Sequence, residues 1–248
     1  GGIVIPELAK KGIKIASHIQ SLGGIKDRSF NNYDQDIEAL GKTNFAVLDL
    51  EKAALMKAKA EEIAAEGDSI GGVLETLVTG MPAGIGEPWF GTLEGLLSYA
   101  LFSVPAIKGV QFGSGFDLVD HKGSEFNDPF FMEGNKVLTK SNNNGGINGG
   151  ISNGMPIIFR SAVKPTPSIY KKQDTINMKE KSDAKLQIEG RHDPAIIHRA
   201  RVVVDSVTAL VIYDALVGRY GTDFFGPYSD KNDDLDLVDQ ELDGGEWL

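Results

Sequence analysis

Residues 142–168 constrain the fold more than any other stretch, because three different backbone requirements follow one another there. A run of glycine and asparagine (NNNGGINGGISNG) comes first, and both residue types tolerate the left-handed backbone region that tight turns need. Residues 155–163 then form a mostly apolar predicted strand, interrupted by Arg160. The segment from Lys164 to Ser168 (KPTPS) follows, and its two prolines stiffen the backbone that presents the hydroxyls.

The local chemistry of this stretch favours an anion. Exposed backbone amides, a lysine and two hydroxyls suit a phosphate or another anionic oxygen. The alternative is a long hairpin connection with ordinary turn chemistry. Local sequence leaves both interpretations open.

The remaining elements alternate irregularly. Residues 3–11 resemble the end of a helix closed by glycine, and 27–45 and 117–144 are polar and irregular. Residues 170–185 indicate a mobile surface loop or an edge hairpin. Apolar spacing predicts helices over 48–65, 92–104 and 195–217, and strands over 13–19, 69–80 and 107–112. This pattern favours an α+β fold, with one domain over 1–229 and an acidic, disordered tail over 230–248.

Composition narrows the class of protein. The 248 residues include no cysteine, which excludes disulfides and thiolate chemistry and is compatible with the cytoplasm. The net charge of −10 argues against a general nucleic-acid binder, because phosphate neutralisation needs clustered cations. No apolar run is long enough for a membrane span, and no secretory signal is recognisable.

Polar residues outside residues 142–168 give weaker signals. His18 is interpreted as an ordinary strand residue and His121 as a solvated loop residue, and no cluster has metal-ligand spacing. In residues 190–194 (GRHDP), Asp193 can cap the following helix, with Pro194 at its first position. Arg191 and His192 precede that helix, where its N-terminus favours an anion.

Six segments in order resemble chorismate synthases. They are residues 67–72 (GDSIGG), 82–88 (PAGIGEP), 103–116 (SVPAIKGVQFGSGF), 145–155 (GGINGGISNGM), 164–169 (KPTPSI) and 190–194 (GRHDP). The resemblance runs through about three-quarters of the chain, and the ordered set is specific although each segment alone is weak. It implies a β-α-β sandwich, with antiparallel sheets and long helices packed between them.

The resemblance also implies an activity. The family eliminates phosphate from 5-enolpyruvylshikimate 3-phosphate to give chorismate, requires reduced FMN, and is typically a homotetramer; NADPH is a candidate reductant. By position, Asp193 is implied as the catalytic residue near the flavin. The residues implied to bind FMN are Pro105, Ala106, Gly149, Lys164, Pro165, Thr166, Pro167, Ser168 and Arg191.

This sequence departs from the family pattern at one position and does not contain two of the family's motifs. Asp205 occupies a position where the family usually has glutamate. The family's two catalytic histidines belong to GESHG-type and RPGHAD-type segments, which would precede Gly1. The chain alone is therefore expected to be inactive. The alternative is a non-catalytic oligomerisation or flavin/anion-binding module that uses the apolar helices at 93–101 and 195–217 for subunit contacts.

Overall fold

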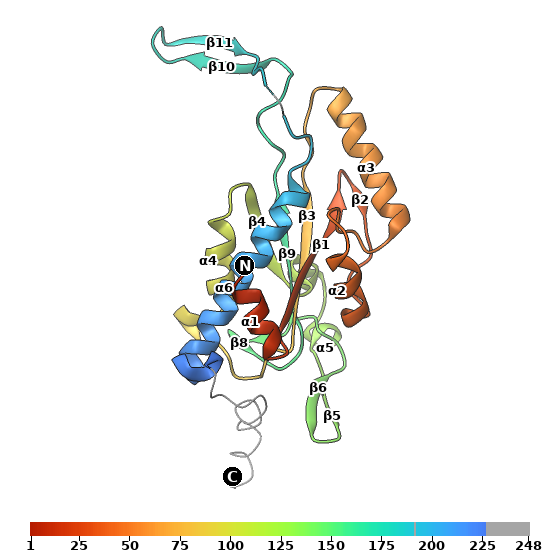
Figure 1. Ribbon diagram of the computed structural model, residues 1–248, viewed down its shortest axis with the longest axis vertical. Helices are drawn as coiled ribbons and strands as arrows, with labels where there is room; N and C mark the ends of the chain where they lie inside the picture. Colours follow the sequence, from red (N-terminus) through yellow and green to blue (C-terminus); the bar gives the residue numbers. More distant parts are fainter. Residues whose placement is uncertain (191, 227–248) are drawn as a thin grey trace.

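A five-stranded antiparallel sheet forms the centre of the molecule (Figure 1). The structure is a computed structural model, and it describes residues 1–190 and 192–226. The strand order is β2 (Ile25–Lys26), β1 (Lys14–Leu22), β3 (Gly72–Thr79), β9 (Ile157–Val163) and β4 (Ile107–Phe112). Together with the helices described below, this sheet confirms the predicted α+β class.

Three helices cover one face of the sheet: α6 (Ile197–Tyr220), α4 (Leu93–Phe102) and α1 (Val4–Lys10). The helix α6 buries residues three or four apart, including Ala200, Val204 and Thr208. They pack against the strand residues of that face, such as Ile19, Leu74 and Phe159. The predicted helical stripes of residues 92–104 and 195–217 are therefore core-forming.

The opposite face carries a second, smaller apolar cluster. Ala16 and Leu77 are paired across β1 and β3, and they pack with Leu40 of α2 (Tyr33–Gly41). The interpretation of residues 27–45 as irregular was therefore wrong, because tertiary burial of one apolar edge stabilises a helix that few local signals mark. The helix α3 (Leu50–Ala65) follows, and Asp49 accepts hydrogen bonds at its N-terminus as a cap.

Residues 117–144 are also more ordered than the sequence indicated. They contain most of a 3-10 turn (Gly115–Asp120), the short helix α5 (Gly123–Phe126), and the hairpin of β5 (Phe130–Glu133) with β6 (Lys136–Thr139). The glycine-rich run forms a second hairpin, from β7 (Ile147–Asn148) and β8 (Ile151–Ser152).

The charged segment after residue 170 is a hairpin of β10 (Gln173–Asn177) and β11 (Ser182–Leu186), which extends away from the main sheet (Figure 1). The edge-hairpin interpretation is thus correct in form, although β10 and β11 pair only with each other. Short 3-10 turns lie at Trp89–Gly91 and Thr222–Phe225. Over residues 1–190 and 192–226, no helix is long and apolar enough to cross a membrane.

The predicted start of α6 was wrong. The helix begins at Ile197, and its N-cap residue, Ile196, makes no side-chain capping bond. Asp193 instead accepts a hydrogen bond from Arg199 at 2.5 Å, so a charge pair replaces the expected cap. The predicted acidic tail lies outside the described residues.

Candidate active site

Four chain segments meet at one end of the sheet, where β9 ends and β3, β4 and α6 begin. The backbone N–H of Lys164 donates to the carbonyl of Ala106 at 2.9 Å. The hydroxyl of Ser69 donates to the carbonyl of Thr166 at 2.6 Å, and the N–H of Ile70 donates to the carbonyl of Pro194 at 2.7 Å. The structure therefore brings residues 105–106, 164–168 and 193–194 to a common end of the sheet.

Close backbone packing holds this site together. A Cβ added at Gly71 would lie 2.5 Å from the carbonyl oxygen of Val163 and 2.9 Å from Cδ of Pro165. Only glycine fits between β3 and the residue 164–168 segment. Ala106 has φ of +76°, which an alanine adopts at a cost in energy. Because the N–H of Lys164 binds its carbonyl, that strained residue is fixed beside the segment.

The side chains of residues 164–168 leave polar capacity for a ligand. Thr166 Oγ1 is buried and has no hydrogen-bond partner among the described residues. Such a group is costly unless something satisfies it. Lys164 Nζ makes a long hydrogen bond of 3.3 Å to the carbonyl of Pro165, within its own turn. An unpaired hydroxyl and a locally tethered cation are the donors that an anionic oxygen would need.

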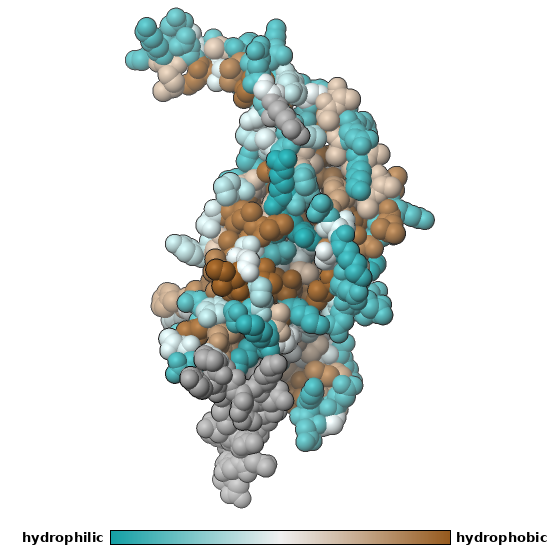
Figure 2. Space-filling view, viewed as in Figure 1, coloured by the Kyte–Doolittle hydropathy of each residue, from teal (hydrophilic) through white to brown (hydrophobic). Residues whose placement is uncertain are grey.

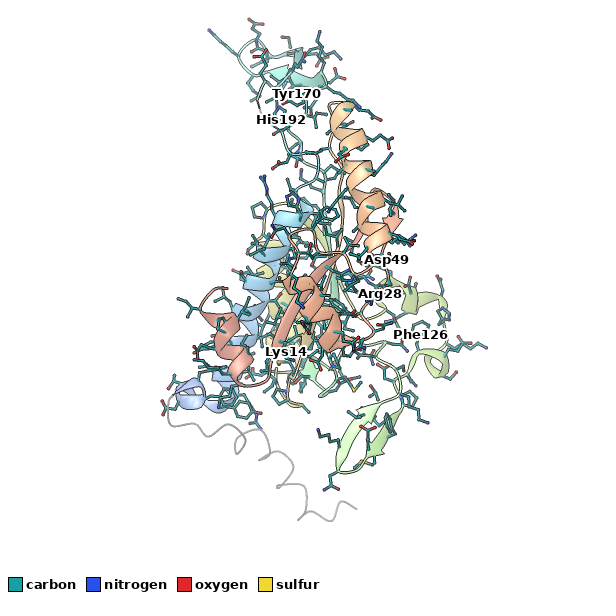
Figure 3. The ribbon with its side chains drawn as sticks, turned by 45° about the vertical axis from the view of Figure 1, so that its right-hand side comes forward. Lys14, Arg28, Asp49, Phe126, Tyr170 and His192 are labelled. Atoms are coloured by element: carbon teal, nitrogen blue, oxygen red, sulfur yellow. The ribbon has the colours of Figure 1, made fainter. Side chains whose placement is uncertain are left out.

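An aromatic pair lies close to the β10–β11 hairpin, in the chain segments on either side of it. The rings of Tyr170 and His192 lie edge to face with centroids 4.6 Å apart, and Figure 3 shows both at the base of the hairpin. The hydroxyl of Tyr170 donates to the carbonyl of Gly190 at 2.5 Å. Arg191 lies outside the described residues.

Gly149 is not brought to the same place. It lies in the turn between β7 and β8, and its neighbour Gly150 packs against Thr92 at the start of α4. Ala106 follows the other end of that helix, and a 10-residue helix is about 15 Å long. The role of Gly149 in cofactor binding stays a prediction.

Sequence reasoning missed a buried ionic network in the middle of the sheet. His18 is fully buried and lies between two carboxylates: Nδ1 is 3.0 Å from Asp27, and Nε2 is 3.1 Å from Glu75. Glu75 also accepts hydrogen bonds from Arg160 Nε at 3.0 Å and from the N–H of Phe30 at 3.1 Å. His18 is therefore not an ordinary strand residue.

The network sets the charge of its members. Burial lowers the pKa of His18, but the hydrogen bonds to Asp27 and Glu75 outweigh it and raise the pKa above its ordinary value. Burial raises the pKa of each carboxyl, and the bond with His18 more than compensates, so the pKa values of Asp27 and Glu75 are lowered. All three pKa shifts therefore favour the charged forms, an imidazolium between two carboxylates, in spite of burial.

One sequence signal could have indicated this network. Glu75 and Arg160 are each the single charged residue of a mostly apolar strand, and His18 lies in the middle of β1, four residues after Lys14. The register pairs His18 with Glu75 and Glu75 with Arg160, which places all three in one row across the sheet. Pattern reasoning recognises each strand but does not give the register between strands far apart in sequence.

Comparison with known proteins identifies the family. The family model described as chorismate synthase matches residues 1–217. A chorismate synthase of Methanosarcina acetivorans is 44% identical over 210 residues, which are 85% of this chain and 57% of that protein. A chorismate synthase of Methanobrevibacter smithii is 45% identical over 217 residues, which are 88% of this chain and 59% of that protein.

A solved structure agrees with the sequence comparison. The structure described as "Crystal Structure of Chorismate Synthase" superposes with a TM-score of 0.74 at 30% identity, over 89% of this chain and 62% of the solved one. The chain therefore spans less than two thirds of the length of these relatives. The sandwich expected from the resemblance is consistent with this neighbour, and the chain belongs to the chorismate synthase family.

Proposed function

We propose that this chain forms the part of a chorismate synthase that carries one wall of its reduced-FMN site. The observation that carries the proposal is the convergence of Ala106, Thr166 and Pro194 at one end of the sheet, in a chain of this family. Asp193 precedes Pro194 and is held by Arg199 on α6. The wall thus combines a cation, a hydroxyl and a carboxylate on a rigid framework.

The residues present fit such a cofactor. The orphaned hydroxyl of Thr166 and the cation of Lys164 would bind an anionic part of FMN, and Pro165, Pro167 and Ser168 would line it. Pro105 and Ala106 would contact the flavin from the start of β4, with Gly149 and Arg191 as further contacts. Reduced flavin supplies electron density that assists the departure of phosphate. Asp193 would hold or accept a proton near the ring.

The complete reaction would be the 1,4-elimination of phosphate from 5-enolpyruvylshikimate 3-phosphate to give chorismate, a lyase step of aromatic amino acid biosynthesis. The 248 residues contain neither a GESHG nor an RPGHAD sequence. We therefore expect this chain alone to lack activity. We further propose a cytoplasmic homotetramer, with NADPH as a candidate source of the electrons that reduce FMN.

Flavin titration tests the proposed wall. FMN fluorescence is followed as the 248-residue chain is added, first alone and then together with the part of the Methanosarcina acetivorans relative that this chain does not cover. Binding that appears with the combination and weakens in Lys164→Gln supports the proposal. The matched control is Lys136→Gln, an exposed lysine on β6. Equal flavin binding by the unmodified chain, Lys164→Gln and Lys136→Gln would contradict the proposed wall.

A second function is favoured by exposed apolar side chains on the outer side of α4 and α6. Tyr99 is 85% exposed, and Val202, Val203 and Leu210 are about half exposed. Figure 2 shows apolar surface over the middle of this face, where α6 lies. Contiguous exposed apolar surface marks interaction sites. A non-catalytic oligomerisation or flavin/anion-binding module would use this surface for subunit contacts.

Sedimentation and flavin titration separate the two functions. A stable oligomer of the chain that binds FMN tightly without any added segment favours the module. A chain that binds FMN only with the added segment favours the enzyme part. Leu210→Glu should dissociate the oligomer in the first case, with the exposed Asp214→Asn on the same helix as the control.

A further inference from the structure

A cavity of about 170 Å³ opens on the face of the sheet opposite α6, apart from the proposed flavin wall. Strands β3 and β9 form its floor, and the turns around residues 29, 114 and 142 form its sides. Its polar lining consists of Ser29, Glu75, Ser114, Asp117, Asn142 and Arg160. The proposed function leaves this cavity without a role.

Arg160 presents a fixed guanidinium to the cavity. Its Nε donates to Glu75 at 3.0 Å, and the carboxylate of Glu75 is itself held by His18, Ser29 and Phe30. Within the described part of the chain, neither Nη atom of Arg160 has a hydrogen-bond partner. The buried network therefore orients a planar donor group whose outer edge is free for a ligand. A guanidinium edge of this kind matches the two oxygens of an oxyanion.

Asn142 supplies the opposite chemistry. Its Nδ2 donates to the carbonyl of Pro156 at 2.7 Å, which fixes the orientation of the amide because a flipped amide would place two oxygens together. Its Oδ1 is buried and unpartnered among residues 1–190 and 192–226. This atom is an acceptor, so a group that carries a proton donor, such as a ligand hydroxyl or a water, can satisfy it, whereas an oxyanion without a proton cannot.

The charge around the cavity is locally positive. A larger groove of about 590 Å³ shares Arg160 and Asp117 with it and adds the lysines Lys26 and Lys108. Among the described residues that line the cavity and the groove, the cations Arg160, Lys26 and Lys108 face two carboxylates, Asp117 and Glu75, which leaves one net positive charge. In a chain of net charge −10, this local excess of positive charge attracts anions.

From this arrangement we propose a second ligand site, which binds a small oxyanion bearing at least one hydroxyl. Two oxygens of the ligand accept hydrogen bonds from the Nη groups of Arg160. The ligand hydroxyl donates to Oδ1 of Asn142. Hydrogen phosphate and small hydroxycarboxylates share this chemistry, whereas sulfate has the oxygens but no proton to donate at neutral pH.

A paired titration of inorganic phosphate and sulfate tests the site. Amide chemical shifts of the 248-residue chain are followed by NMR, with glycolate and acetate as the corresponding carboxylate pair. We expect phosphate and glycolate to shift the amides of Ser114 and Asn143. Both should bind about tenfold more tightly than sulfate and acetate, because sulfate and acetate carry no hydroxyl that can donate to Asn142. If phosphate binds and glycolate does not, the ligand is a phosphate; the reverse result identifies a carboxylate.

Variants locate the binding. Arg160→Gln should weaken phosphate binding about tenfold or more, and Arg160→Lys should restore part of it, because charge returns without the fork. Lys164→Gln should leave the phosphate-induced shifts of Ser114 and Asn143 unchanged, because Lys164 does not line this cavity, so failure of the flavin proposal does not affect the test. Thermal unfolding of each variant establishes that it is folded. If Arg160→Gln does not fold, the amide shifts of Ser114 and Asn143 in the unmodified chain decide whether the ligand binds in this cavity.

Two results would overturn the proposal. One is phosphate binding with no shift at Ser114 or Asn143, which would place the ion elsewhere. The other is equal affinity for phosphate and sulfate and for glycolate and acetate, which would show that the acceptor of Asn142 plays no part.

Discussion

The hydroxyl of Ser17 on β1 donates to a carboxylate oxygen of Asp205 on α6 at 2.5 Å, and both side chains are buried between the helix and the sheet. Burial raises the pKa of Asp205 from 3.8 to about 6, although the bond from Ser17 and the nearby charge of Arg201 oppose the shift. An ionised carboxylate in this position is therefore unfavourable for folding at neutral pH.

A pH dependence follows from this pair. The folded state binds the proton of Asp205 more tightly than the unfolded state, so stability from this group is full at low pH and falls as the pH rises from 3.8 to about 6. Asp205→Asn should remove that fall and stabilise the protein above pH 6 by up to roughly 3 kcal/mol. Urea unfolding across this range measures it. The exposed Asp214→Asn on the same helix is the control, and an unchanged pH slope in Asp205→Asn would contradict the assignment.

The buried histidine network predicts a large destabilisation. His18→Ala leaves the carboxylates of Asp27 and Glu75 buried without their shared cation, which should cost about 3–5 kcal/mol in the free energy of unfolding. His121→Ala, which removes a half-exposed histidine, should cost little. Equal losses in the two variants would show that the cluster contributes nothing beyond its packing.

The stability that the same network contributes also depends on pH, and the part due to His18 is lost as the pH rises. The pKa of His18 is raised above 6.5, so its contribution is fully present below pH 6.5 and is lost as the pH rises through the raised value. The lowered pKa values of Asp27 and Glu75 act in the opposite direction, and their contribution is lost on acidification below their ordinary values of 3.8 and 4.5. Titration of the His18 ring by NMR checks the sign; a pKa below 6.5 would contradict it.

Thr166 separates stability from ligand binding. Because Oγ1 is buried without a partner, Thr166→Val should leave the free protein as stable or more stable, by up to about 1–3 kcal/mol. The same change should weaken flavin binding if that hydroxyl contacts the ligand. Thermal unfolding and FMN titration measure the two effects, with Thr175→Val on the exposed hairpin as the control. A loss of stability with unaltered flavin binding would assign Thr166 to the framework alone.

The packing around Gly71 predicts that adding one methyl group at this position destabilises the protein. Gly71→Ala places a Cβ 2.5 Å from the carbonyl oxygen of Val163, so residues 163–165 must shift, at a cost of about 1–3 kcal/mol. Gly218→Ala, in open space on α6, should instead stabilise by up to about 1 kcal/mol. The midpoint of thermal unfolding distinguishes them. Similar midpoints for both variants would mean that the segment is not held against β3.

Local sequence signals predicted the elements that carry strong periodicity or clear boundaries. The helix over residues 50–65 has a capping aspartate at Asp49, and residues 157–163 bury every second side chain as the strand pattern indicated. The helix over residues 33–41 was missed because its stability comes from packing of Leu40 on the sheet. The start of α6 was misplaced because Asp193 pairs with Arg199 instead of capping.

The site residues also fall into two groups, those that the sequence indicated and those that only the fold brings together. Residues 164–168 and the segment before α6 were associated through the family resemblance. In the structure Ser69 donates to Thr166 and Ile70 donates to Pro194, so residues 69–70 hold both segments at one end of the sheet. The row of His18, Glu75 and Arg160 depends on the register of three strands from distant parts of the sequence. Single-strand patterns contain no information on that register, so the network became visible only in the folded chain.

The most direct test of the central claim is the formation of chorismate from 5-enolpyruvylshikimate 3-phosphate with reduced FMN. The 248-residue chain is assayed alone and after mixing with the part of the Methanosarcina acetivorans relative that it does not cover. We predict no product from the chain alone and measurable product from the mixture, with the activity of the mixture reduced by Asp193→Asn. Turnover by the chain alone, or full activity of the mixture with Asp193→Asn, would contradict this account.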